Sequence, residues 1–198
     1  QYALNGDPLF CAIFIILSAI FDFFDGFVAR LLKVSSDIGK ELDSLADVIS
    51  FGFAPAALVC SMFKDYTYPE SMFWIAPYLP YTAFIIAAFS AVRLAKFNLD
   101  TRQSHSFIGM PTPANALLII GIANAPLLQV AWTTPVWGLI FLFSLIILTS
   151  YLLVCELPMF SLKTPSKLPL IFAVSALVLT IAFLCLGYGL LGLAISMV

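Results

Sequence analysis

The residues best suited to chemistry lie between Asp22 and Asp47. This stretch reads D-x2-D-G-x2-A-R-x8-G-x3-D-x3-D and is flanked by two long apolar runs. It contains six of the eleven acidic residues of the chain. A charged side chain at the centre of a bilayer costs roughly 2.5–3.5 kcal/mol. So many acids within a chain that is 62% hydrophobic therefore indicate a function.

The spacing predicts that four of these carboxylates converge if both flanking runs are helices. Asp22 and Asp25 are then i, i+3 neighbours, while Asp43 and Asp47 follow Gly39 along one stripe of the second helix. Four convergent carboxylates repel one another unless cations lie between them. Hard ions such as Mg²⁺ or Mn²⁺ suit an all-carboxylate site, and two ions suit four carboxylates. We therefore expect a two-metal site.

Two glycines lie on the same helix faces as the aspartates. Gly26 and Gly39 disfavour helix formation, so each requires a reason. One reason is close approach of the backbone to a ligand whose phosphate Arg30 can hold. The other is helix packing through small residues. For either glycine alone, both explanations remain open. Two glycines on the same helix faces as the aspartates favour close approach to a ligand.

The rest of the chain is typical of a polytopic membrane protein, with 198 residues, a mean hydropathy of +1.06 and 10% charged residues. We expect an all-α membrane helix bundle that forms one domain over residues 1–198, with about six transmembrane helices and a polar cavity open to the cytoplasm. Since the chain begins with Gln1, we expect that an N-terminal segment of the natural protein is missing. The net charge reflects the aspartates, and we expect no nucleic-acid partner. The expected spans, most of them near the ~20 residues that a bilayer requires, are Pro8–Leu32, Gly39–Phe63, Met72–Phe97, Pro111–Val130, Pro135–Val154 and Leu168–Leu191.

The basic residues predict the orientation in the membrane. Only Lys64 falls on one side of the expected bundle, and the other eight basic residues fall on the opposite side. The positive-inside rule makes that opposite side cytoplasmic. The aspartates then face the cytoplasm in a multi-pass protein of a bacterial or archaeal-type inner membrane. The eight residues are Arg30, Lys33, Lys40, Arg93, Lys96, Arg102, Lys163 and Lys167.

A second polar stretch ends the third expected span and reads R-L-A-K-F-N. Arg93 and Lys96 are i, i+3 neighbours and can face the aspartates across the bundle. With Asn98 they can form an anion site for an acceptor or for a lipid diphosphate. The alternative is that both cations only set the topology and extend to the membrane surface.

The aspartate pattern resembles, position for position, the signature of the CDP-alcohol phosphotransferase family. Its members are integral membrane enzymes that move a phosphatidyl-type group from a CDP-linked lipid to an alcohol. Three further runs resemble the phosphatidylserine synthase branch: D-V-I-S-F-G-F-A-P-A from Asp47, R-L-A-K-F-N, and F-I-G-M-P-T-P from Phe107. Lys96 departs from that branch, which commonly has Arg at this position. A guanidinium that can bind an anion through two hydrogen bonds is therefore replaced by the single ammonium group of lysine. The resemblance covers about Asp7 to Ala116.

This resemblance implies transfer of the phosphatidyl group from CDP-diacylglycerol to L-serine, with CMP as the second product. It also implies a homodimer among membrane lipids. Asp47 is then the general base and also a metal ligand. The expected metal ligands are Asp22, Asp25, Asp43 and Asp47. The expected CDP-lipid contacts are Asp22, Gly26, Ala29, Arg30, Gly39 and Asp43. The expected acceptor contacts are Ser50, Arg93, Lys96 and Asn98.

Three alternatives remain. Glycerol 3-phosphate, inositol phosphate or inositol can replace serine as the acceptor in the same chemistry. A cation-coupled transporter would also use intramembrane acids, but these acids cluster at one edge and the sequence has no visible inverted repeat. A structural membrane protein would gain nothing from four convergent carboxylates. Release of CMP from a CDP-lipid separates the enzyme from the other two classes.

Overall fold

The computed structural model describes residues 7–32, 36–99, 107–134, 137–155 and 158–159. Nearly all of them are helical, which confirms the expected all-α fold. Two strands of two residues each, β1 (Phe107–Ile108) and β2 (Pro158–Met159), pair antiparallel. The helices are α1 (Pro8–Leu32), α2 (Asp37–Asp47), the π-helix η1 (Val48–Phe53), α3 (Ala54–Lys64), the 3₁₀-helices η2 (Glu70–Met72) and η3 (Leu79–Phe84), α4 (Ile85–Leu99), α5 (Thr112–Ala123), α6 (Pro126–Thr133) and α7 (Gly138–Val154).

The second expected span is one continuous helix made of α2, η1 and α3. Helical backbone is kept through both junctions, where Val48 has φ −59° and Ala54 has φ −64°. In the π-helical segment between them the hydrogen bonds run from i to i+5, so the winding is wider than in an α-helix. This wider turn changes the angle between the face of α2 that carries the aspartates and the buried face of α3. All residues of α3 from Pro55 to Phe63 are buried.

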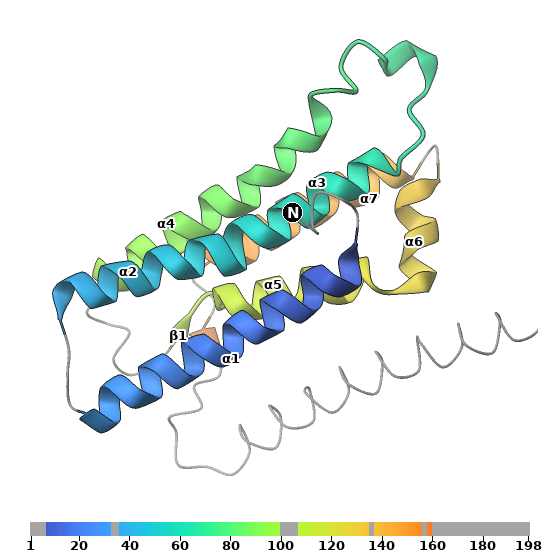
Figure 1. Ribbon diagram of the computed structural model, residues 1–198. Coiled ribbons are helices and arrows are strands. Elements are labelled where there is room, and N and C mark those ends of the chain that lie inside the picture. Colours follow the sequence, from blue (N-terminus) through green and yellow to red (C-terminus); the bar gives the residue numbers. More distant parts are fainter. Residues whose placement is uncertain (1–6, 33–35, 100–106, 135–136, 156–157, 160–198) are drawn as a thin grey trace, which may run out of the picture.

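The α2–η1–α3 helix lies in the middle of the bundle (Figure 1). Helix α1 lies beside α5, and α6 lies across one end of the bundle. Segment η1 packs on α4 and α5, and α4 packs on α7. Asn98 near the end of α4 donates a hydrogen bond to Ser44 of α2 over 3.0 Å. The C-terminal end of α4 therefore lies beside the C-terminal half of α2.

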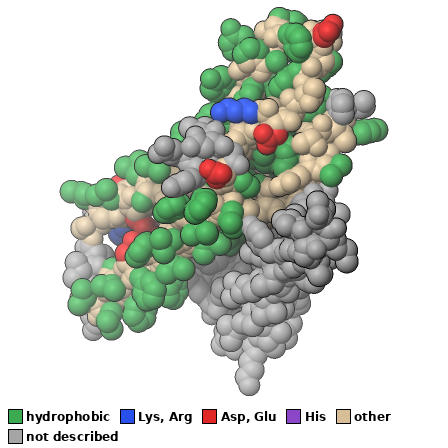
Figure 2. All heavy atoms as spheres, turned by 45° about the vertical axis from the view of Figure 1, so that its right-hand side comes forward, with side chains coloured by type: hydrophobic (Ala, Val, Ile, Leu, Met, Phe, Trp, Pro, Cys, Tyr) green, Lys and Arg blue, Asp and Glu red, His purple; other side chains and the backbone are tan. Residues whose placement is uncertain are grey.

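The surface of the bundle is that of a membrane protein. Large hydrophobic side chains are exposed along α1, including Phe21, Phe23, Phe24 and Leu31. Figure 2 shows many hydrophobic side chains on the described part of this face and few charged groups. An apolar patch of this extent suits lipid rather than water. Three helical stretches are long and apolar enough to cross a membrane, namely Pro8–Ala29, Ile38–Lys64 and Leu79–Leu99, and the shorter helices α5 and α7 are also apolar.

The expected spans agree with these helices with two corrections. The third span begins at Leu79 instead of Met72, and Pro77 and Pro80 in this region lack the N–H that an α-helix needs. The fourth span is divided, because α5 ends at Ala123 and α6 begins at Pro126. Ala125 between them has an extended backbone (φ −85°, ψ 110°), as expected for a residue that precedes proline. The sixth expected span, Leu168–Leu191, lies outside the described residues.

Candidate active site

Three of the four predicted aspartates converge between α1 and α2. Carboxylate oxygens of Asp22, Asp25 and Asp43 lie within 4.8 Å of one another. The side chains of Asp22 and Asp43 are in hydrogen-bond contact. Two ionised carboxylates have no proton to share, so this contact requires either a shared proton or a cation between them.

Asp47 has a different environment from these three residues. It ends α2, one turn beyond Asp43, and is half-buried. It is not part of the group whose oxygens lie within 4.8 Å of one another. Its carboxylate nevertheless interacts electrostatically with Asp22 and Asp43, and with the positive charge of Arg93 on α4. The charge of Asp47 is therefore influenced both by the acidic cluster and by a cation of α4.

Arg93 is the only buried charged side chain in the described part of the chain, with 9% of its surface exposed. Its guanidinium carbon lies 5.7 Å from the centroid of the Phe97 ring. Its Nε is buried and has no hydrogen-bond partner among the described residues. A buried cation needs a compensating charge, and Asp47 supplies one. The arginine of the second polar stretch thus interacts electrostatically with one of the aspartates, and its role as an acceptor contact stays a prediction.

The other expected acceptor contacts are placed differently. Lys96 is exposed, and Ser50 is half-buried within η1. The amide of Asn98 donates to Ser44 Oγ, so it connects α4 to α2. Of the three polar residues in the R-L-A-K-F-N run, only Arg93 is buried.

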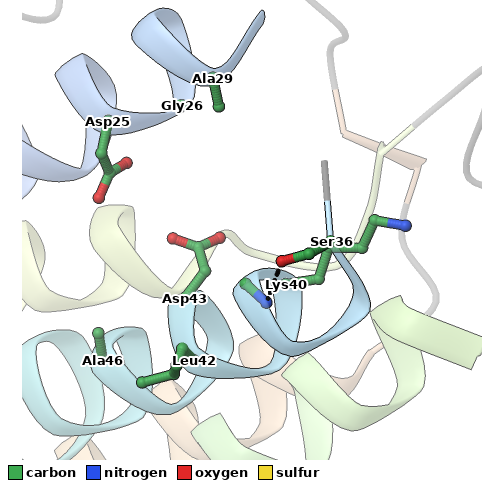
Figure 3. Close-up of a pocket in the computed structure, with 9 residues that line it drawn as sticks. Asp25, Gly26, Ala29, Ser36, Lys40, Leu42, Asp43 and Ala46 are labelled. Carbon is green, nitrogen blue, oxygen red and sulfur yellow. Dashed lines mark hydrogen bonds between the residues drawn. The ribbon is translucent and has the colours of Figure 1, made fainter. Parts of the chain in front are cut away.

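A pocket of about 570 Å³ lies between α1 and α2, a volume within the range of small-molecule sites. Figure 3 shows that the carboxylates of Asp25 and Asp43 point toward one another across it. Gly26 and Ala29 line the α1 side, and the side chain of Arg30 lies outside the described residues. The remaining lining residues belong to α2 and its cap: Ser36, Gly39, Lys40, Leu42, Asp43 and Ala46.

The two glycines of the pocket have different roles. A Cβ at Gly26 would meet nothing within 4 Å, so its absence leaves the pocket wall open. A Cβ at Gly39 would lie 2.9 Å from Ser36 Oγ. Ser36 caps α2, since its Oγ accepts a hydrogen bond from Gly39 N over 3.0 Å. Gly39 therefore makes room for the cap that determines where α2 begins.

The donor set suits a hard divalent cation. Each of Asp22, Asp25 and Asp43 offers a carboxylate oxygen, and the three oxygens lie close enough to share an ion. Sets made only of oxygen ligands favour Mg²⁺, Mn²⁺ or Ca²⁺ over softer metals. A bound cation would also remove the repulsion between the carboxylates of Asp22 and Asp43.

Sequence reasoning missed several polar side chains in the bundle interior. Thr112 and Asn115 on α5 are both 0% exposed, and Ser150 on α7 is 4% exposed. Thr112 Oγ1, Ser150 Oγ and both amide atoms of Asn115 have no hydrogen-bond partner among the described residues. The sequence signal for these groups was Asn115, a polar residue inside the fourth expected span that directly precedes the apolar residues Ala116–Ile120.

Comparison with known proteins places the chain in a family. The model of the CDP-alcohol phosphatidyltransferase family matches residues 2–198. The chain belongs to this family. The match confirms the resemblance read from the aspartate pattern.

Several relatives share one name, CDP-diacylglycerol–serine O-phosphatidyltransferase. The protein of this name from Mycobacterium leprae is 35% identical over 91% of this chain and 59% of its own length. Those from Helicobacter pylori and Methanocaldococcus jannaschii are each 42% identical, over 54% and 56% of this chain. These matches cover 42% and 48% of the lengths of those two proteins. The chain thus spans about half the length of the relatives that it matches.

Proposed function

We propose that this family member transfers the phosphatidyl group from CDP-diacylglycerol to the hydroxyl of L-serine and releases CMP. The observation that carries the proposal is the convergence of Asp22, Asp25 and Asp43 at a pocket between two membrane helices, with Asp47 one turn away. The shared name of the relatives supports serine as the acceptor. The Ser-Phe-Gly run after Asp47 also supports it.

The pocket between α1 and α2 suits the CDP end of the lipid. Gly26 leaves the wall open on the α1 side, so a diphosphate can approach the backbone there. Gly39 and Ala29 are further proposed contacts, together with Arg30, Asp22 and Asp43. The exposed apolar side chains of α1 allow the lipid tails to stay in the membrane while the nucleotide enters the pocket.

A diphosphate beside three carboxylates requires compensation of its negative charge. Mg²⁺ or Mn²⁺ ions, most simply two, held by Asp22, Asp25 and Asp43 with Asp47 as a further ligand, would neutralise the diphosphate and stabilise the departing CMP. The carboxylates would hold these ions at a defined depth, because α1 and α2 fix the positions of Asp22, Asp25 and Asp43.

We propose Asp47 as the general base. A serine hydroxyl is a weak nucleophile at neutral pH, so a positioned carboxylate must take its proton. The serine oxygen then forms a bond to the phosphorus that carries the diacylglycerol. The bond from that phosphorus to the oxygen of CMP breaks, and its electron pair leaves with CMP. Arg93 interacts electrostatically with Asp47 and can pair with the carboxylate of serine. Lys96, Asn98 and Ser50 are further proposed acceptor contacts.

The site is proposed to open to the cytoplasm. The end of the bundle that holds Lys40, Arg93 and Lys96 also holds the aspartates, whereas Lys64 ends α3 at the opposite end. The positive-inside rule makes the first end cytoplasmic, in a bacterial or archaeal-type inner membrane. We further propose that residues 1–198 form one domain and that the protein is a homodimer, as the family resemblance implies.

Release of labelled CMP from CDP-diacylglycerol tests the proposed function. The purified protein is given Mg²⁺ or Mn²⁺ and one acceptor at a time: L-serine, glycerol 3-phosphate, inositol phosphate or inositol. We expect turnover with serine alone and its loss on addition of EDTA. Turnover only with another alcohol would leave the aspartate site intact and reject serine as the acceptor.

The variant Asp47→Asn tests the role of the base. We expect it to abolish turnover while binding of CDP-diacylglycerol is largely retained, because the acidic cluster between α1 and α2 remains. Loss of nucleotide-lipid binding in this variant would argue against a base and in favour of a principal metal ligand.

A further inference from the structure

Four helical elements pack on one another in a ring next to Asp47. Segment η1 packs on α4, α4 packs on α7, α7 packs on α5, and α5 packs on η1. Asp47 directly precedes η1, and Arg93 of α4 interacts with it electrostatically. One element of this ring, η1, therefore directly follows the proposed base.

Three of the four ring elements contribute buried polar groups that lack a partner within the described residues. These are Arg93 Nε on α4, Ser150 Oγ on α7, and Thr112 Oγ1 with both amide atoms of Asn115 on α5. Thr112 and Asn115 are i, i+3 neighbours and share one face of α5. Met110 N donates to Leu152 O over 2.9 Å, so the start of α5 lies against the end of α7 that carries Ser150.

Other buried hydroxyls of the same helices donate hydrogen bonds to backbone carbonyls of their own helix. Thr149 is 0% exposed and donates to Leu145 O over 2.8 Å. Ser90 is also 0% exposed and donates to Ile86 O over 2.8 Å. Burying a polar group without a partner destabilises the fold. The unpaired groups of Asn115, Thr112 and Ser150 therefore indicate a bound polar molecule.

We propose that Asn115 and Thr112, together with Ser150, form a buried subsite for the amino and carboxylate groups of the acceptor, which aims its hydroxyl at Asp47. An amide offers both a donor and an acceptor, and hydroxyls offer both as well. Arg93 adds a positive charge for the carboxylate. This set suits a small zwitterion better than a neutral polyol. The inference rests on the proposed function, since it names the groups that recognise its acceptor.

Steady-state CMP release by purified protein tests the subsite. Asn115→Leu and Thr112→Val keep the approximate size of each side chain and remove its hydrogen bonds. Loss of one hydrogen bond to a charged group corresponds to about tenfold or more in binding. We expect the KM for L-serine to rise by at least about this factor in each variant, with the KM for CDP-diacylglycerol unchanged. If Asn115→Leu does not fold, Thr112→Val carries the same comparison.

Thr149→Val is the matched control. Thr149 is as buried as Thr112, but its hydroxyl is bonded within its own helix. We expect both KM values of this variant to equal those of the wild type. An unchanged serine KM in Asn115→Leu and Thr112→Val, or an equal rise in all three variants, would overturn the subsite and leave water or packing as the role of these groups.

The same variants separate this inference from the proposed function. If the wild type uses another alcohol, serine is wrong as the acceptor, and the thermal unfolding temperature with and without L-serine then decides whether the subsite binds amino and carboxylate groups. If no alcohol releases CMP, the thermal unfolding temperature with and without L-serine is the readout. A serine-dependent rise that Asn115→Leu loses and Thr149→Val keeps supports the subsite. No rise in the wild type overturns it.

Discussion

Gly52 of η1 lies directly against Ser90 of α4. A Cβ at Gly52 would be 2.9 Å from the Ser90 Cβ and 3.6 Å from the Ala87 Cα. From this contact, η1 leads back to Asp47 and α4 leads on to Arg93, whose charge interacts electrostatically with that of Asp47. The absence of a side chain at Gly52 therefore sets how closely η1 and α4 approach, and with it the distance between the proposed base and the cation.

We predict that Gly52→Ala lowers both stability and turnover. The added methyl group overpacks the contact with Ser90, which typically costs about 1–3 kcal/mol, and it moves α4 with Arg93 away from Asp47. Thermal unfolding and CMP release measure the two effects. Gly121→Ala on α5 is the control, because nothing lies within 4 Å of its added Cβ and alanine favours a helix by roughly 0.5–1 kcal/mol. Equal stability and turnover for Gly52→Ala and the wild type would contradict this role of the contact.

The hydrogen bond from Asn98 to Ser44 gives a second prediction. If its main role is to join α4 to α2, Asn98→Ala and Ser44→Ala should lower stability by similar amounts. Together they should show a coupling of about 0.5–1.5 kcal/mol in a double-mutant cycle. If Asn98 contacts the acceptor, as its sequence position suggests, Asn98→Ala alone should raise the KM for serine. If the KM for serine equals the wild-type value in both Asn98→Ala and Ser44→Ala, Asn98 is assigned to helix packing.

The aspartate site was predictable because helical periodicity determines which residues share a face. Asp22 and Asp25 lie three residues apart, and Asp43 lies four residues after Gly39, so two helices in contact bring their carboxylates together. The position of Asp47 outside the closest group was not predictable, because it depends on how α2 and η1 pack against α4. Helix periodicity alone gives the same face to both Asp43 and Asp47.

Other features depend on packing between distant parts of the chain. The π-helical geometry of Val48–Phe53 has no clear sequence signal, since these residues are also compatible with an α-helix. The division of the fourth span did have a signal in Pro126. The unpaired polar atoms of Asn115 and Thr112 became visible only with the tertiary contacts, because an asparagine beside an apolar run can face lipid, solvent or the core.

Gly26→Ala should separate substrate binding from stability. Its added Cβ meets nothing within 4 Å, so the helix should be as stable as in the wild type or more stable by roughly 0.5–1 kcal/mol. The methyl group would nevertheless occupy the pocket wall where the diphosphate is proposed to approach. We expect a higher KM for CDP-diacylglycerol with an unchanged KM for serine. A wild-type KM for the lipid would show that the open space at Gly26 is not used by the nucleotide.

Removal of one carboxylate should change how the protein responds to divalent cations. Without metal, Asp22, Asp25 and Asp43 repel one another, so Asp43→Asn should raise the thermal unfolding temperature of the metal-free protein. Added Mg²⁺ or Mn²⁺ should stabilise the wild type, because an ion that binds only the folded state shifts the unfolding equilibrium. The variant should need at least about tenfold more metal for the same shift, as expected when a ligand is weakened, and it should release CMP more slowly. Asp65→Asn is the matched control, since this exposed aspartate follows α3 at the other end of the bundle, and it should respond to metal as the wild type does. An unchanged metal response in Asp43→Asn would remove Asp43 from the ligand set.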